Sequence, residues 1–268
     1  MALKLLYRMS RFWLNYGNPL QILFKRYLVK NGKMIVVDRK TGIRCQCKIA
    51  SYQMFGETWY NKDYDIPHFP IRQDDIVIDI GANQGFFACY AAYQGAKVFA
   101  FEPFEESFKT MMDNLELNQL SDRIVARPWA IGGQDGSTEL IYTNWLGGGM
   151  NTINVDFVKE TALNTLGSTT VNCYTLPRII EEFNINRIRL CKIDCEGAEF
   201  DILKQLKPKD LNKIDAFVLE YHPGYPLEEL LQLVLSWGTH QVSFAEDNEH
   251  CERSILRLVA NAELKAPL

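Results

Sequence analysis

The sequence predicts an α/β fold in which a mostly parallel β-sheet is covered by helices on both faces. Two observations carry this prediction. Short strand patterns alternate with helical patterns from residue 76 onward, and the strand patterns are apolar on both faces, as in "IVIDIG" at 76–81. Such strands are buried on both sides, which requires helices above and below a parallel sheet. We expect seven strands in this sheet and a small extension in front of it.

The first 69 residues predict that extension. Cations at positions 4, 8 and 11 share one helical face and apolar residues share another, which predicts an amphipathic helix. Asn31-Gly32 lies between two apolar runs, a strong signal for a β-hairpin within residues 20–50. The composition changes near residue 70. We therefore expect a helical and hairpin extension over 1–69, as a cap or dimer element, and the main domain over 70–268.

The main domain contains the alternating elements in order. We expect strands at 76–81, 97–103, 124–132, 188–197 and 216–223, helices at 84–95, 104–118, 198–206 and 226–238, an extra strand at 137–144, and two final strands at 240–246 and 253–261. Because no helix separates the last two strands, they should form an antiparallel pair. Ligands of such sheets bind beyond the carboxyl ends of the strands.

Charge is distributed unevenly along the chain. The net charge is −4, but residues 1–50 carry +10 and the remainder carries −14. A basic arm could contact a membrane peripherally through residues 1–30, pair with a second subunit in a homodimer, or pack on its own acidic body, which we favour. The acidic body argues against a nucleic-acid partner. We find no apolar run long enough to span a membrane.

Cysteine usage indicates the compartment. The chain has seven cysteines without C-x-x-C spacing, which argues against a disulfide framework and a zinc ribbon. Cys45 and Cys47 alternate with polar residues, so both should face the core from one strand. These features predict a reducing, cytoplasmic environment.

A glycine turn follows the first strand of the main domain. Gly81 and Gly85 permit a sharp turn into a helix, and Glu102 ends the next strand, where an acidic side chain reaches ribose hydroxyls in nucleotide-binding folds. Asp79 precedes the turn and adds negative charge, which suits a cationic ligand. S-adenosylmethionine carries an ammonium and a sulfonium, so it fits this turn better than a diphosphate does.

The turn departs from the dinucleotide fingerprint G-x-G-x-x-G. Asn83 and Phe86 occupy the second and third glycine positions, where they would obstruct a pyrophosphate and helix–strand packing. An NAD-dependent enzyme of the nucleotide-sugar type is therefore the alternative rather than the first hypothesis. A non-catalytic adaptor that uses the basic arm is a third.

Three segments resemble a known family. "DIGANQGFF" after residue 78, "FEP" at 101–103 and "KIDCEGAEFDIL" at 192–203 look like the FkbM-type S-adenosylmethionine-dependent methyltransferases. The resemblance covers residues 50–260 and implies a Rossmann-like class I fold and methylation of hydroxyl oxygens on natural products or saccharides. It implies that Asp79, Gly81, Asn83, Gly85 and Glu102 line the cofactor site. We also assign to that site Ala82, Pro103, Phe104, Ala130 and Asp194.

Acidic side chains and an imidazole end the two central strands. Lys192, Asp194 and Glu196 share one face of a strand, and Glu220 and His222 do the same on the next. We expect Lys192 to neutralise Asp194 or Glu196, and we assign the other four residues to catalysis. His222 is the expected base for a hydroxyl acceptor, and neighbouring carboxylates should raise its pKa.

Two further expectations concern the surroundings of this site. Asp194, Glu196 and Glu220 offer hard oxygen ligands, so a divalent ion is a rival account that we do not favour. The segments "FGETWYNKDY" at 55–64 and "WLGGGMNT" at 145–152 could close over the ligands, or could be ordinary surface loops.

Overall fold

The computed structural model describes residues 10, 12–28, 32–143, 150–161, 164–222, 224–244 and 254–262. Its named helices are α2 (Pro19–Leu28), the 3₁₀ turn η1 (Ile49–Ser51), α3 (Tyr52–Gly56), the π-helical turn η2 (Glu57–Asn61), α4 (Phe86–Tyr93), α5 (Glu105–Leu117), α6 (Val155–Thr161), α7 (Leu176–Glu182), α8 (Glu199–Leu203), α9 (Pro208–Leu211) and α10 (Leu227–Ser236). Its strands are β1 (Lys33–Val37), β2 (Arg44–Lys48), β3 (Ile76–Ile80), β4 (Lys97–Phe101), β5 (Ile124–Arg127), β6 (Ala130–Ile131), β7 (Gly136–Thr143), β8 (Thr165–Tyr174), β9 (Leu190–Ile193), β10 (Ala216–Tyr221), β11 (His240–Phe244) and β12 (Ser254–Ala260).

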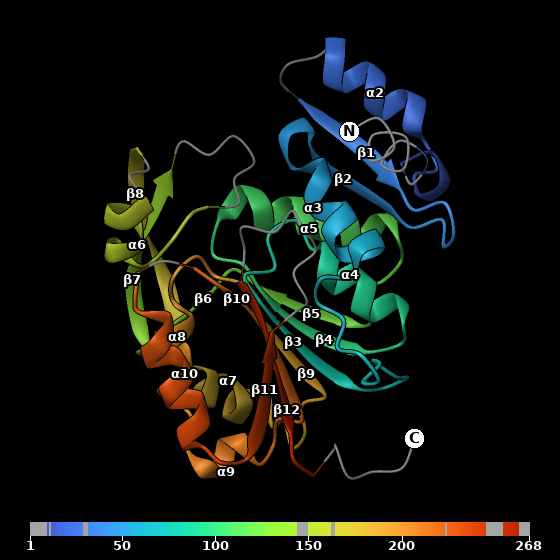
Figure 1. Cartoon of the computed structure of the whole chain (residues 1–268). Helices are drawn as coiled ribbons and strands as arrows, with labels where there is room; N and C mark the ends of the chain where they lie inside the picture. Colours follow the sequence, from blue (N-terminus) through green and yellow to red (C-terminus); the bar gives the residue numbers. More distant parts are fainter. Residues whose placement is uncertain are drawn as a thin grey trace.

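Seven strands form the main sheet, in the order β11-β12-β10-β9-β3-β4-β5 (Figure 1). Neighbours from β10 to β5 are parallel, and β12 is antiparallel to both β10 and β11. The predicted seven-stranded, mostly parallel sheet with a final antiparallel pair is therefore confirmed. The strand order reverses beside β3, where β9 lies on one side and β4 on the other. This is the position at which ligands bind in open α/β sheets.

Alternate residues of the central strands enter two separate cores. Val77 packs into a cluster that includes α4 and the N-terminal extension, whereas Ile78 packs into a cluster that includes α7, α8 and α10. The same alternation places Leu190 on the first face and Cys191 on the second. Each strand is thus buried on both sides, which explains its continuous apolar pattern.

The segment 124–132, expected as one strand, is divided between two sheets. Pro128 follows β5 and has no N–H to donate, so the ladder with β4 ends there. The chain resumes as β6, which pairs with β8 in a three-stranded sheet of order β6-β8-β7. The extra strand expected at 137–144 is the antiparallel partner β7 in that sheet. Figure 1 shows this small sheet projecting beside the main one.

The extension contains a hairpin whose turn lies at 38–43, after the expected Asn31-Gly32 pair, of which Asn31 lies outside the described residues. The residues before that pair are helical through Leu28, and β1 pairs with β2 across the turn at 38–43. Asp38 stabilises this turn by accepting hydrogen bonds from the amide and hydroxyl of Thr41. Cys45 and Cys47 are completely buried, as expected. In Figure 1, α3, α4 and α5 lie between the main sheet and the part of the extension formed by α2 and the hairpin.

Other expectations from the N-terminal half are only partly covered by the described residues. Most of the expected amphipathic helix lies outside them, and residues 12–15 are helical. The boundary near residue 70 stays a prediction. Six cysteines are described, and all six are free thiols. Across the described ranges we find no helix that is both long and apolar enough to cross a bilayer.

Candidate active site

A cavity of about 510 Å³ opens at the carboxyl ends of the central strands. Ten of the residues assigned from the sequence line it. They lie in the turn after β3, at or just beyond the ends of β4, β9 and β10, and at the start of β6. These residues are Gly81, Ala82, Asn83, Glu102, Pro103, Ala130, Asp194, Glu196, Glu220 and His222. The remaining walls include the apolar side chains Phe86, Phe101, Trp129, Ile131 and Leu140. The cavity therefore has an apolar part and an acidic part.

The glycine turn forms one wall, and Gly81 has a specific steric role there. Its φ is +73°, and a Cβ atom would lie 1.8 Å from the carbonyl oxygen of Asp194. Glycine is thus required because the end of β9 approaches the turn closely, not only because a ligand does. Asn83 also has a positive φ, of 48°, and its Oδ1 accepts a hydrogen bond from the Ser107 hydroxyl.

Glu102 follows β4 and forms a hydrogen bond with the same turn. Its two carboxylate oxygens accept hydrogen bonds from the backbone amides of Asn83 and Phe104, each at 2.8 Å. Burial raises the pKa of Glu102 to about 7, although these two amides oppose the shift. A carboxylate offers about four lone-pair positions, so Glu102 can still accept hydrogen bonds from a ligand's hydroxyls.

Three residues assigned to the cofactor site do not line the cavity: Asp79, Gly85 and Phe104. The missing Cβ of Gly85 makes room for Met111 of α5, whose Cγ would lie 2.6 Å away. Phe104 caps α5 at its N-terminus and packs on Tyr142. Asp79 is completely buried and forms an ion pair with Lys192, its cross-strand neighbour on β9. Its position therefore does not provide the direct ligand contact that the sequence suggested.

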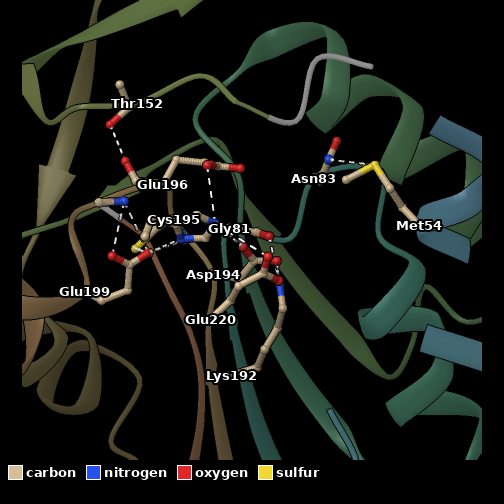
Figure 2. A network of polar contacts seen from close by, with 12 residues as sticks. Met54, Gly81, Asn83, Thr152, Lys192, Asp194, Cys195, Glu196, Glu199 and Glu220 are labelled. Atoms are coloured by element: carbon tan, nitrogen blue, oxygen red, sulfur yellow. Dashed lines mark hydrogen bonds and ion pairs between the residues drawn. The ribbon is translucent and has the colours of Figure 1, made fainter. Parts of the chain in front are cut away.

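Lys192 lines the cavity and links two acids, Asp79 and Asp194. Its ammonium lies 3.2 Å from both Asp79 and Asp194 and donates to the carbonyl oxygen of Gly81 (Figure 2). Of the two acids expected as partners of Lys192, Asp194 is confirmed, and Asp79 is a second partner that the sequence did not predict. Burial favours the neutral form of Asp194, but Lys192 and His222 outweigh it and lower the pKa of Asp194. Asp194 is therefore ionised at neutral pH.

Three carboxylates surround one nitrogen of His222. Its Nε2 lies 3.4 Å from Glu196, 3.6 Å from Glu220 and 3.9 Å from Asp194. The convergence expected from the two strand ends is thus present. Burial favours the neutral imidazole, but the carboxylates of Glu196 and Glu199 outweigh it and hold the pKa of His222 well above its usual value. Burial raises the pKa of Glu196 to about 8, against the opposing effect of His222.

Sequence reasoning missed Glu199, which is completely buried and holds the other side of His222. Its carboxylate lies 2.9 Å from His222 Nδ1, accepts from the Tyr225 hydroxyl at 2.9 Å, and accepts from the amides of Cys195 and Gly197. Figure 2 shows the Glu199 side chain beside the loop that joins β9 to α8, which contains Cys195. The signal in the sequence was a second acid in "EGAE", which also reads as an ordinary first-turn helix residue.

Tyr64 was also missed as an individual site residue. Its hydroxyl lies 2.9 Å from Asp194 and 3.1 Å from Glu220, so it connects the ends of β9 and β10. Burial and these two carboxylates raise the pKa of Tyr64 well above its usual value, which keeps the hydroxyl protonated as a donor.

The structure allows a comparison with the rival metal account. Ligand atoms of Asp194, Glu220 and His222 lie within 4.8 Å of one another, close enough to share an ion. Lys192 already supplies a cation to Asp194, and Tyr64 supplies a donor to both carboxylates. These side chains already occupy part of the possible ligand set, and the metal-free account stays a prediction.

The two expected covering segments contribute to the cavity to different extents. From 55–64, Glu57, Thr58 and Tyr64 line it. From 145–152, residues 145–149 lie outside the described residues, whereas Met150 and Asn151 line the cavity. Whether either segment closes over a ligand stays a prediction.

Known proteins resemble this chain over most of its main domain. The model of the methyltransferase FkbM domain matches residues 79–240. Methyltransferase 1 of Beauveria bassiana is 28% identical over 184 residues, covering 61% of this chain and 70% of that protein. The 31-O-demethyl-FK506 methyltransferase FkbM of Streptomyces tacrolimicus is 27% identical, covering 57% of this chain and 67% of that protein.

Two further relatives extend the comparison. The hexuronic acid methyltransferase AglP of Haloferax volcanii is 22% identical, covering 61% of this chain and 62% of that protein. The crystal structure of methyltransferase FkbM from Methylobacillus flagellatus superposes with a TM-score of 0.49 and 17% identity, over 75% of this chain and 47% of that one. The architecture is a Rossmann-like class I methyltransferase fold. The family match covers more than half of the sequence, and the chain belongs to the FkbM methyltransferase family.

Proposed function

We propose that this protein is an S-adenosylmethionine-dependent O-methyltransferase that acts on a hydroxyl of a small natural product or a saccharide. Use of S-adenosylmethionine is implied by the family. The single observation that carries the proposal is the shared cavity, in which the Gly81–Glu102 wall faces the Asp194–Glu220–His222 cluster. The proposal thus assigns the methyl donor and the proton acceptor to one cavity.

The residues of the cavity fit this cofactor in charge and polarity. Asp194 is ionised and suits the positive charges of the sulfonium and the ammonium. Glu102 has free lone pairs for two ribose hydroxyls, and Phe101 and Trp129 offer apolar surface for an adenine. Asp79 supports the site indirectly, because it fixes Lys192 beneath Gly81 and Asp194.

S-adenosylmethionine, when bound, supplies an electrophilic methyl group. The protein must then hold the acceptor hydroxyl in line and receive its proton. Holding two reactants in line contributes about 7–11 kcal/mol in favourable cases. His222 Nε2 is our candidate for the proton acceptor, and Glu199 fixes the ring through Nδ1.

The raised pKa of His222 determines how this base depends on pH. At neutral pH the imidazole is largely protonated, because the pKa of His222 lies well above its usual value. Only the neutral ring can accept a proton, so turnover should rise with pH toward the pKa of His222. Burial of the site limits competition from water at this nitrogen, since His222 is 9% exposed.

Methyl transfer from radiolabelled S-adenosylmethionine to a panel of sugars, sugar acids and hydroxylated polyketides tests the proposal. Names of relatives guide the panel, since one acts on a hexuronic acid and another on a demethylated FK506. We expect label on an oxygen of at least one acceptor, and we expect His222→Ala to abolish turnover while cofactor affinity is unchanged. Full turnover by His222→Ala would remove this residue as the base, and transfer only to nitrogen would overturn O-methylation.

A further inference from the structure

Exposed apolar side chains are concentrated in the N-terminal extension. Within the described residues, five large apolar side chains with more than two-fifths of their surface exposed lie between positions 13 and 27: Trp13, Leu14, Leu20, Phe24 and Tyr27. The other exposed large apolar residues lie singly on six different elements: Tyr93, Met112, Val155, Leu166, Leu235 and Phe244. A single exposed apolar residue is normal, whereas a contiguous group indicates an interaction surface.

Three of these five side chains belong to helix α2 and form an outward-facing ridge. Leu20, Phe24 and Tyr27 follow at i, i+4 and i+7, so they share one helical face, and they are 70%, 60% and 75% exposed. Ile22 lies on the opposite face and is completely buried. The ridge therefore faces away from the core, and Figure 1 shows α2 at the outer edge of the molecule.

Hydrogen bonds fix α2 in this orientation. The side chain of Asn18 donates to the carbonyl oxygen of Ile35 at 2.6 Å and accepts from the amide of Val37 at 3.1 Å. At the other end of the helix, the Lys25 ammonium donates to the carbonyl oxygen of Lys33 at 2.8 Å. The ridge is thus held outward by the hairpin at both ends of α2.

The part of the sequence that contains the ridge is positively charged. Residues 1–50 carry eleven Lys and Arg and a single acid, Asp38. Asp38 is buried and accepts hydrogen bonds from Thr41, so it adds almost no negative charge to the surface of residues 1–50. Arg26 in the last turn of α2 is exposed, and its guanidinium donates a hydrogen bond to the Tyr52 hydroxyl. The remainder of the chain carries −14.

We propose that the ridge of α2, with its flanking cations, docks on the surface of an anionic lipid bilayer. A row of Leu, Phe and Tyr beside Lys and Arg has the composition of helices that lie in the headgroup region. Charge complementarity fixes the orientation, because an anionic surface attracts the extension and repels the acidic body. The cavity is partly lined by Ala50, Gln53 and Met54 of the extension, so docking places the active site near the membrane.

A second copy of the chain fits the ridge less well. In a two-fold dimer the ridge would pack on the same ridge of the second copy. That arrangement would also bring together the two N-terminal regions, each with a charge of +10 over residues 1–50, and like charges repel. The proposal does not depend on methyl transfer, since binding to lipid is measured without cofactor or acceptor.

Flotation of the full chain with lipid vesicles tests the proposal. Vesicles of phosphatidylcholine with about 30 mol% phosphatidylserine are compared with pure phosphatidylcholine, at low salt and at about 0.5 M salt. We expect binding to the anionic vesicles, loss of at least about tenfold in affinity for Leu20→Glu/Phe24→Glu, and weaker binding at high salt. The control Met112→Glu/Leu235→Glu, which changes two exposed residues elsewhere, should bind like the original chain.

Three outcomes would overturn the proposal. They are absence of binding to anionic vesicles, equal binding by the ridge variant and its control, and equal binding to neutral vesicles. Sedimentation velocity adds a fourth, because a dimer that dissociates in Leu20→Glu/Phe24→Glu would assign the ridge to a second copy. Thermal melting and binding of S-adenosylhomocysteine verify that both variants are folded.

Discussion

Replacing Glu199 by Gln should shift the pH dependence of turnover to lower pH. In the original protein, Glu199 Oε1 faces three N–H groups: the His222 ring and the amides of Cys195 and Gly197. Its Oε2 accepts from the Tyr225 hydroxyl. The Gln oxygen can keep the first position and its NH₂ can face Tyr225, which can accept. The variant therefore removes a charge and retains most of the hydrogen bonds.

The size of the shift follows from the lost charge. A hydrogen bond to a charged group contributes about 1.5–3 kcal/mol, and one pKa unit corresponds to about 1.4 kcal/mol. The imidazolium of His222 loses one such partner at 2.9 Å. Its pKa should fall by about 1–2 units, and the rising limb of kcat/KM should move to lower pH by the same amount.

Two assays measure this shift. The pH profile of kcat/KM reports the base in the free enzyme, and NMR titration of the His222 ring reports its pKa without any acceptor. Asp201→Asn is the matched control, because it also removes an acid from α8, but this acid is half-exposed and paired with Lys204. An unchanged profile in Glu199→Gln, or a shift to higher pH, would refute the assigned role of Glu199.

Three other substitutions test separate parts of the site. Gly81→Ala places a Cβ 1.8 Å from the Asp194 carbonyl oxygen, whereas Gly42→Ala has a similar φ and no atom within 4 Å. Both variants adopt an unfavourable backbone at a cost of about 1–2 kcal/mol, but only the first should lose about 1–3 kcal/mol more in urea unfolding; equal losses would contradict the close approach. Glu102→Gln should abolish a rise in cofactor affinity between about pH 6 and pH 8, because ribose hydroxyls prefer the ionised carboxylate and the pKa of Glu102 is about 7; a persisting rise would contradict this. Lys192→Met should lower the free energy of unfolding by about 3–5 kcal/mol, since it leaves two buried carboxylates without the Lys192 ammonium. A loss below about 1 kcal/mol, which is typical of an exposed ion pair, would contradict that arrangement.

The parts of the site that follow from local rules were predictable. Asp194 and His222 lie at strand ends with period-two spacing, and parallel strands bring such ends to one edge of the sheet. Glu102 was found by its distance from the glycine turn. Each prediction needed only the order of strands along the chain and the alternation of side chains. These rules fix which edge a residue occupies, and ten assigned residues line one cavity.

The parts that depend on contacts between distant segments were not predictable. Tyr64 bonds to Asp194 across 130 positions of sequence, and no local pattern indicates that approach. Asp79 was expected to face a ligand, but the register between β3 and β9 places it opposite Lys192. Gly85 was expected to admit a ligand, but α5 brings Met111 against it. Sheet register and helix packing decide such contacts, and neither can be determined from one strand or one helix alone.

The hairpin illustrates a different limit. Asn-Gly favours a tight turn wherever strands flank it. Here the preceding residues form α2, which buries Ile22 against the hairpin core. Tertiary burial of a helix outweighs a local turn preference, and the turn of the hairpin lies at 38–43, where Asp38 stabilises it.

Calorimetric titration with S-adenosylhomocysteine tests the central claim most directly. The account predicts one micromolar site per chain, at least about tenfold weaker in Glu102→Ala because a charged acceptor for ribose is lost. NAD should produce no heat under the same conditions. Absence of binding by S-adenosylhomocysteine, or saturable binding of NAD instead, would contradict the account.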